Sequence, residues 1–338
     1  MDLKDVIREH ALPFLPAKSL SRFQGVCRDW KLQISTPFFA HNQSLSFHSF
    51  SGLFCQSPGD PPSFFSIDPE SYGVPDPSLK FLPDPVDIRA SSNGLLCCQG
   101  WRDRAYYICN PVTKLWKKLP EPNGDHGSDP AVVLVFEPSL LNFVAEYKLI
   151  CAFPSADFDN ATEFEIYSSI EGCWKISGEI CFADRKLLPR SGVHVNGVVY
   201  WQAKHSGIVA FDLTKDRSQL IQGYCGVKGS LGTADGKLCS VYASNRSILV
   251  NVLSNIYSNT MHMNSNARTW VEKDRFHLDN TVLREVAVDQ AEVVYAGDNL
   301  VVVQSGGKIF YCDMKTKKTA FLCNAADFAT SLDSRRYY

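Results

Sequence analysis

The residue types that most often carry chemistry are scattered along this chain, and their spacing fits no catalytic motif. Among the eight histidines, no two stand two or four residues apart, as the ligands of one metal ion often do. The H-E-x-x-H and G-x-S-x-G patterns of metalloproteases and serine hydrolases do not occur. Asp125-His126 and His277-Leu278-Asp279 are better interpreted as polar turns than as catalytic groups. The sequence therefore predicts no catalytic residue, no metal site and no cofactor.

One glycine-rich stretch, residues 223–232, resembles a phosphate-binding loop only superficially. A P-loop requires a glycine five residues before its Gly-Lys pair and a serine or threonine directly after it. The nearby Gly236-Lys237 pair has neither, because Leu231 precedes it at that distance and Leu238 follows it. We interpret the stretch as an ordinary loop.

The 12 cysteines do not form a C-x-x-C pair. Many lie inside apolar, strand-like runs, such as Leu95–Cys98, Tyr107–Cys109 and Leu149–Cys151. In a reducing compartment, cysteines in such runs act as small buried hydrophobic residues rather than as disulfide partners or zinc ligands. We therefore expect these thiols to be part of a hydrophobic core.

The composition is that of a folded globular protein of 338 residues, 45% hydrophobic and 21% charged. With a formal net charge of -2 and dispersed basic residues, the chain lacks the basic band that nucleic acids or anionic membranes would attract. The segment Met1–Asp5 has no signal-peptide character, and no run of residues is apolar enough for a membrane span. We expect a location in the cytoplasm, the nucleus or both.

The elements that must position any functional site fall into two parts. Up to about residue 40, apolar residues recur every three or four positions, which is typical of amphipathic helices; they are Leu3, Ile7, Ala11, Leu20, Phe23, Cys27, Trp30 and Ile34. Pro13 and Pro16 interrupt this pattern, so the first helix should end near Leu12 and the next should begin near Ala17. Gly25 is a second expected break.

Beyond residue 44 the pattern becomes that of short β-strands separated by Asn-Gly, Asp-Gly and proline-containing turns. The segments 93–116, 196–215 and 299–317 repeat one order, in which apolar strands are followed by a polar turn rich in threonine and lysine. Weaker copies occur at 147–174 and 235–270. A period of roughly 50 residues is typical of kelch-type propellers, and it predicts about six blades. Propeller blades bury their faces against one another, so we expect a closed ring.

Tryptophan recurs near the strands of these repeats, at Trp116, Trp174, Trp201 and Trp270. An aromatic side chain at a repeated strand position more often belongs to a core than to a ligand platform. We therefore expect these tryptophans to pack between blades.

The segment from Leu3 to Trp30, and above all its Leu-Pro-Ala-Lys-Ser-Leu run followed by Val-Cys-Arg-x-Trp, resembles an F-box. The resemblance implies a small helical module that binds a Skp-family adaptor and, through it, a cullin-RING ubiquitin ligase. It implies adaptor contacts at Leu12, Leu15, Pro16, Leu20, Val26 and Cys27. The residues expected to hold the module together are Leu3, Ile7, Phe23, Trp30 and Ile34. Lys4, Ala11 and Pro13-Phe14 depart from the family pattern.

The downstream part resembles the F-box-associated, kelch-like regions of plant F-box proteins over most of residues 44–325. The resemblance rests on Ser91–Leu96, Asn110–Pro120 and Val195–Trp201. Together, the two resemblances imply an α+β multidomain protein, with a helical F-box at 1–40 and an all-β, six-bladed kelch-like propeller at 44–338.

The implied function is that of a non-catalytic substrate receptor of an SCF-type ubiquitin ligase. The F-box would bind the Skp adaptor, and the propeller would bind an unknown target protein. The sequence does not identify the substrate-binding residues, although the loops 52–85 and 121–130 are candidates. Two alternatives stay open: a propeller enzyme with merely structural N-terminal helices, and an F-box scaffold that binds the adaptor without delivering substrates for degradation.

Overall fold

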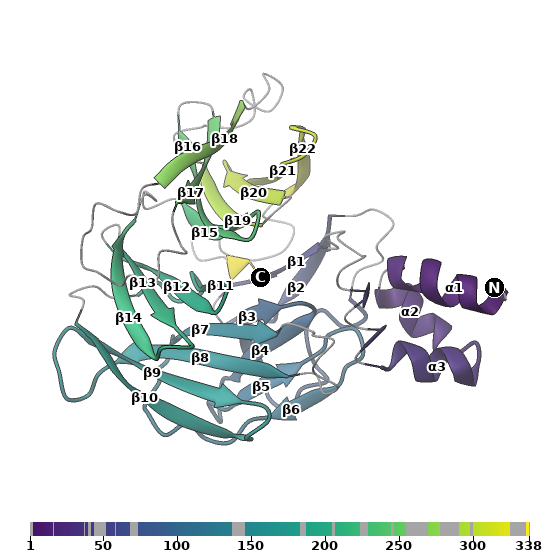
Figure 1. The fold of residues 1–338 in the computed structure, drawn as a ribbon, viewed down its shortest axis with the longest axis horizontal. Coiled ribbons are helices and arrows are strands. Elements are labelled where there is room, and N and C mark those ends of the chain that lie inside the picture. The colour runs from purple at the N-terminus through teal and green to yellow at the C-terminus, as the bar shows by residue number, and fades with distance from the viewer. Residues whose placement is uncertain are drawn as a thin grey trace.

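A computed structural model describes much of the chain, from the N-terminal helices to a short C-terminal strand. The described residues are 3–15, 17–36, 38–39, 42–43, 52–57, 59–67, 74–136, 146–182, 187–204, 207–223, 229–244, 247–254, 270–277, 291–297, 300–324 and 336–337. Figure 1 shows a ring of sheets, with the helices at one side of it and outside it. The arrangement is mostly β-propeller with small N-terminal helices, as predicted.

The N-terminal helices are α1 (Leu3–His10), a 3₁₀ turn (Leu12–Phe14), α2 (Ala17–Phe23) and α3 (Arg28–Ile34). Helix α2 begins at the predicted residue, and α1 ends two residues before the predicted position. Gly25 lies in the turn between α2 and α3, so this predicted break is confirmed. At the start of α3, the Cys27 Sγ accepts a 3.4 Å hydrogen bond from the Trp30 N–H, which satisfies a donor that the first helical turn cannot pair.

The ring consists of five four-stranded antiparallel sheets and one three-stranded sheet. Following the chain around the ring, the first blade holds β3 (Val86–Ser92), β4 (Leu95–Gly100), β5 (Tyr106–Cys109) and β6 (Trp116–Lys118). The next holds β7 (Ala131–Phe136), β8 (Tyr147–Pro154), β9 (Ala161–Ser168) and β10 (Cys173–Phe182). The third holds β11 (Val193–Val195), β12 (Val198–Ala203), β13 (Gly207–Asp212) and β14 (Arg217–Gln222).

The remaining blades follow the same order. One holds β15 (Ser230–Ala234), β16 (Lys237–Ser244), β17 (Ser247–Leu253) and β18 (Trp270–His277). The last holds β19 (Glu292–Ala296), β20 (Leu300–Ser305), β21 (Lys308–Asp313) and β22 (Thr319–Asn324). The three-stranded sheet joins β2 (Ser63–Ser66), β1 (Gly52–Gln56) and the C-terminal β23 (Arg336–Tyr337) in that order.

The predicted number of six blades is wrong, because the described residues form five four-stranded blades. Dividing the length of the β region by a fixed period assumes that each stretch supplies four strands in succession. Among the described residues of the β region before β3, only β1 and β2 belong to the sheets, and β23 from near the C-terminus pairs with β1. Both ends of the β region therefore contribute to one smaller sheet.

Buried clusters between neighbouring sheets close the ring. Leu53 and Cys55 of β1 pack in one cluster with Val302 and Ile309 of the last blade. On the other side of the same sheet, Phe54 packs with residues of the first blade. Further clusters join each four-stranded blade to the next. Each sheet thus buries both faces, which a ring allows and an isolated sheet does not.

The polar turn predicted from the repeats is confirmed as one local structure. In the first blade, Asn110 Oδ1 accepts hydrogen bonds from the N–H groups of Val112 and Thr113, at 2.9 and 3.1 Å. Asp212 Oδ1 accepts the equivalent bonds from the N–H groups of Thr214 and Lys215, and Asp313 Oδ1 accepts them from Lys315 and Thr316. In each turn the fourth residue after this cap has a positive φ: 60° at Lys114, 52° at Asp216 and 59° at Lys317.

The tryptophans expected to pack between blades differ in their burial. Trp201 and Trp174 are buried in inter-blade clusters, and Trp270 packs partly buried against another. Trp116 is 45% exposed on the edge strand β6, so the prediction is wrong there. Because β6 is the last strand of its sheet, one side of Trp116 faces no further strand.

The predicted burial is confirmed for the cysteines of the apolar, strand-like runs. Cys97, Cys98, Cys109 and Cys151 are at most 1% exposed. Within the described part of the chain, no helix is long and apolar enough to cross a membrane. The same residues include no group of three or more histidine, cysteine, aspartate or glutamate side chains placed to hold a metal ion.

Candidate functional site

The core of the helical module is formed by Leu12, Leu20 and Phe39, which are 1%, 6% and 3% exposed. Partly buried side chains pack against this core: Ile7, Leu15, Phe23, Trp30 and Ile34. The rings of Phe23 and Trp30 meet edge to face with their centroids 5.5 Å apart. Ile7, Phe23, Trp30 and Ile34 were predicted to stabilise the module, and this packing agrees with that prediction.

Burial corrects the division between core and adaptor face at two positions. Leu12 and Leu20 were assigned to the adaptor face, but both are almost fully enclosed by the module itself. The physical reason is that Phe39, which follows α3 along the chain, packs in the same core and covers Leu12 and Leu20. Leu3 is the first residue of α1, and Pro16 lies outside the described residues. Adaptor binding by any of these residues stays a prediction.

A second set of apolar side chains on this module is exposed. Val26 is 60% exposed, and Cys27 beside it is also exposed. Residues that were not predicted as adaptor contacts extend this set: Val6 is 38% exposed, Phe14 55%, Leu32 62% and Phe38 62%. Their helical spacing was visible in the sequence, but the direction of each side chain depends on how the short helices pack. The module therefore has apolar surface left over for a partner.

The loop 121–130, a candidate for substrate recognition, is held by a buried polar cluster. Glu165 of β9 is fully buried, and its carboxylate accepts hydrogen bonds from the Asn123 and Gly124 N–H groups at 2.9 and 3.1 Å. His126 Nε2 lies 2.8 Å from the same carboxylate, and its Nδ1 lies 3.0 Å from the hydroxyl of Tyr106. This loop is thus anchored between the first and second blades.

Burial and the carboxylate act in opposite directions on His126. Burial lowers the pKa of His126 below its ordinary 6.5, although the hydrogen bond and charge of Glu165 favour the protonated ring. Burial also raises the pKa of the Tyr106 phenol. The consistent assignment is a neutral imidazole that donates from Nε2 to Glu165 and accepts from Tyr106 at Nδ1. All three groups are paired and hidden from solvent, which suits a structural clamp rather than a catalytic dyad.

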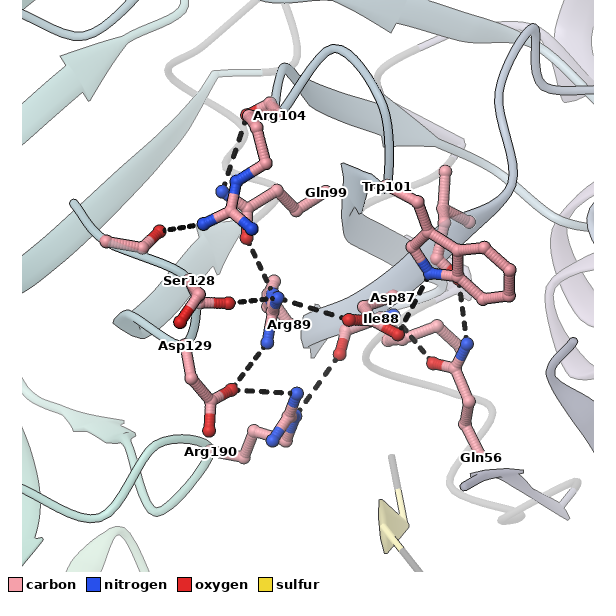
Figure 2. Close-up of polar contacts among 12 residues, drawn as sticks. Gln56, Asp87, Ile88, Arg89, Gln99, Trp101, Arg104, Ser128, Asp129 and Arg190 are labelled. Atoms are coloured by element: carbon pink, nitrogen blue, oxygen red, sulfur yellow. Dashed lines mark hydrogen bonds and ion pairs between the residues drawn. The ribbon is translucent and has the colours of Figure 1, made fainter. Parts of the chain in front are cut away.

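A second polar cluster surrounds Arg89, which is 3% exposed on β3 (Figure 2). Its guanidinium donates to Asp129 Oδ1 at 2.6 Å, to Asp87 Oδ2 at 3.2 Å and to the Ser128 carbonyl at 2.8 Å. Its Nε donates to Gln99 Oε1 at 3.0 Å. No sequence pattern indicated this cluster, because Ser128 and Asp129 are 39 and 40 residues from Arg89 along the chain.

The Arg89 cluster connects several sheets of the ring. Arg190, which precedes β11, lies 3.0 Å from Asp129 and also contacts the Ile88 carbonyl at 3.4 Å. Gln56 of β1 donates to the Val86 carbonyl at 2.7 Å and accepts from the Ile88 N–H at 2.9 Å. Contacts from three blades and the three-stranded sheet therefore meet at β3. Since the charges pair with one another, we interpret this cluster as a structural connection between neighbouring sheets of the ring.

Comparison with known proteins gives the chain its relatives. Residues 79–227, which span β3 to β14, match a family model described as "F-box protein At3g26010-like, beta-propeller". F-box protein At5g49610 of Arabidopsis thaliana is 42% identical over 110 residues, covering 32% of this chain and 30% of that protein. F-box protein At5g07610 is 30% identical over 246 residues, covering 65% and 56%. F-box/kelch-repeat protein At3g23880 is 25% identical over 241 residues, covering 64% of each.

The predicted resemblance to plant F-box proteins with a kelch-like propeller is thus confirmed. The chain spans 30% and 56% of the lengths of the first two relatives named above. The matched family model falls on the first three blades.

Proposed function

We propose that this protein is a substrate-recognition subunit of an SCF-type ubiquitin ligase. Residues 1–40 act as the F-box that binds a Skp-family adaptor, and residues 44–338 act as the propeller that binds a target protein. The chain itself performs no chemistry. It holds the target near a charged ubiquitin-conjugating enzyme, so that transfer to a lysine becomes an effectively intramolecular reaction.

The observation that best supports adaptor binding is the exposed apolar surface of the helical module. Val26, Leu32 and Phe38 are each at least 60% exposed, although a module this small gains stability from every apolar group that it buries. Large apolar side chains exposed to this degree are candidates for contacts with a partner. The relatives named above are F-box proteins, which supports the same partner.

The proposal includes location and partners. We infer that the protein works in the cytoplasm, the nucleus or both, where ubiquitin ligases meet their targets and where buried thiols stay reduced. It needs no cofactor, and its partners are the Skp adaptor, the cullin-RING ligase bound through it, and a target protein.

Substitution of Val26 tests adaptor binding. Val26→Glu places a charge on the exposed apolar surface, and truncation or charging of an interface anchor often costs about 2 kcal/mol, or roughly thirtyfold in affinity. Ser21→Glu adds the same charge at an exposed polar position of α2 and should bind normally. Affinity for purified Skp adaptor, measured by calorimetry on the whole chain, separates the two. Equal affinity of both variants, or no binding by the unchanged protein, would refute the proposed contact.

A further inference from the structure

The outer edge of the first blade carries an unusual set of exposed side chains. Strand β6 has no buried residue. Leu115, at the end of the preceding turn, is 72% exposed, and Trp116 is 45% exposed. Lys117 and Lys118 follow them, and all three residues of β6 are exposed. We call the stretch Leu115–Lys118 the β6 edge.

The side chains of the β6 edge are arranged so that each face has one apolar and one basic residue. Successive residues of a strand point to opposite faces. Trp116 meets the ring of Tyr107 edge to face at 5.9 Å, and the Lys118 ammonium lies over the same ring. Leu115 and Lys117 therefore lie on the other face. Lys118 is paired with Asp103 at 2.8 Å, whereas no carboxylate of the described residues lies within ion-pair distance of Lys117.

The main chain of the β6 edge also has open groups. The Asn110 N–H bonds to the Leu115 carbonyl, and the Leu119 N–H bonds to the Tyr106 carbonyl, both at 2.9 Å. Hydrogen-bonded and non-bonded pairs alternate along an antiparallel ladder, so the N–H of Trp116 points away from β5. Because β6 is the last strand of its sheet, that N–H faces the open edge.

The same position in the third blade shows what such an edge can bind. Counting from the equivalent caps Asn110 and Asp212, Trp116 corresponds to Ser218 of β14. The Ser218 N–H donates to Glu179 Oε1 of β10 at 2.8 Å, and its hydroxyl donates to the same oxygen at 2.6 Å. Arg217 lies 3.1 Å from the other oxygen of Glu179. A carboxylate from the neighbouring blade thus occupies the outer edge of β14.

No carboxylate of the described residues bonds to the corresponding N–H of Trp116. We propose that the β6 edge is a docking site for an extended acidic segment of a partner protein, which adds to the sheet as a further strand. The segment places carboxylates against the lysines, a main-chain carbonyl against the Trp116 N–H, and apolar side chains against Leu115 and Trp116. The free positive charge of Lys117, next to exposed apolar surface, selects an acidic partner over a basic or neutral one.

This inference rests on the proposed function only in taking the partner to be a ligase target. Docking at the β6 edge itself requires no adaptor. Lysines on an edge strand can also serve solely to prevent sheet-to-sheet aggregation, and in that case no acidic peptide would bind. The two roles are therefore separated by a binding measurement.

The test uses a short fluorescein-labelled peptide with a Glu-Glu-Val-Val core. Paired antiparallel to the β6 edge, this order puts valines opposite Leu115 and Trp116 and glutamates opposite the lysines. Fluorescence anisotropy with the whole chain should show saturable binding. A peptide with serines in place of the valines keeps the charge, and it should bind at least about tenfold more weakly, a difference of roughly 1.4 kcal/mol. Equal binding of both peptides would show non-specific attraction and overturn the proposal.

Two pairs of variants locate the site. Lys117→Glu should lower the affinity for the acidic peptide about tenfold, whereas Lys237→Glu, the same change at an exposed lysine of another blade, should not lower it. Trp116→Pro and Trp116→Val both remove the indole, but only proline removes the N–H, and proline is tolerated on an edge strand. Weaker binding by the proline variant than by the valine variant supports strand addition.

Three further outcomes would overturn the inference: no saturable binding by the unchanged chain, normal binding by Lys117→Glu, or equal losses for Lys117→Glu and Lys237→Glu. The variant Lys117→Glu is also measured with the Skp adaptor. Loss of peptide binding with normal adaptor binding assigns the effect to the β6 edge, and failure of adaptor binding by the unchanged chain tests the proposed function separately.

Discussion

At the level of single residues, burial divides the helical module into enclosed and exposed apolar side chains. Leu20 and Val26 both belong to the F-box-like motif, but Leu20 is 6% exposed and Val26 is 60% exposed. The sequence predicted the helices and the half-buried residues Phe23, Trp30 and Ile34. It could not predict that Leu12 and Leu20 are enclosed, because Phe39 packs against them from a later part of the chain, after α3. The apolar periodicity of one helix does not show which side chain of a later segment covers it.

Truncation of Leu20 should therefore destabilise the module rather than act on an adaptor contact alone. Leu20→Ala leaves a cavity, and such core truncations cost about 2–5 kcal/mol. Hydrogen exchange of residues 3–36, followed by mass spectrometry, should become faster in this variant. Exchange in the propeller strands should not change, because the helical core is a separate cluster. Val26→Ala is the control, and faster exchange in both variants, or in neither, would contradict the assignment.

The cysteines give a second prediction at this scale. Burial raises the pKa of the Cys312 thiol to about 11, and it also raises the pKa of Cys97 and Cys151. Because the thiolate is the reactive form, these thiols should resist alkylation by iodoacetamide in the folded protein at mildly alkaline pH. Exposed Cys27 and Cys173 should react first. Peptide mass spectrometry measures the order, and early labelling of Cys97 or Cys151 would show that the strands open.

At the level of elements, the repeated turn was predictable because its chemistry is local. Asn110, Asp212 and Asp313 each accept the same two N–H bonds from residues two and three positions later, and all of these residues lie within one short segment. The buried clusters of Glu165 and Arg89 were not predictable. Their partners are 39 and 40 residues apart at His126–Glu165 and Arg89–Asp129, and only the arrangement of the blades brings them together.

The clamp formed by His126 should make stability depend on pH. The folded state holds His126 below its ordinary pKa of 6.5, so the unfolded chain binds the proton more readily. Stability that depends on this group is complete above pH 6.5 and declines as the pH falls toward the lowered pKa of the folded state. The melting temperature should therefore fall when the pH is lowered from about 7.5 to about 5.5.

His126→Gln isolates this effect. A glutamine can donate to Glu165 and accept from Tyr106, but it does not titrate. Its melting temperature should change less than that of the unchanged protein over the same pH range. His126→Ala should be less stable at every pH, because a stranded buried polar group costs about 1–3 kcal/mol. If His126→Gln and the unchanged protein have the same pH profile, titration of His126 does not limit stability.

At the level of the whole molecule, the sequence predicted a closed propeller ring but not the number of blades or the strands that close the ring. The repeats at 93–116, 196–215 and 299–317 correctly indicated propeller blades. The blade number was wrong because β1, β2 and β23 come from opposite ends of the β region and form a single smaller sheet. A repeat period in the sequence indicates the blades whose four strands follow one another along the chain. It does not indicate a sheet whose strands come from both ends of the β region.

Closure of the ring places Leu53 of β1 in one buried cluster with Val302 of β20. It therefore predicts that the two side chains are energetically coupled. Both side chains are fully buried, and Leu53→Ala alone should cost about 2–5 kcal/mol. Residues that share a cluster are typically coupled by about 0.5–3 kcal/mol in a double-mutant cycle, whereas distant sites add within about 0.5 kcal/mol. We therefore expect the effects of Leu53→Ala and Val302→Ala on the free energy of unfolding to be non-additive in urea unfolding.

The effects of Leu53→Ala and Val209→Ala should be additive, because Val209 lies in the cluster between the second and third blades. Additivity of the first pair would mean that the ends of the β region do not meet in solution and that the ring is open.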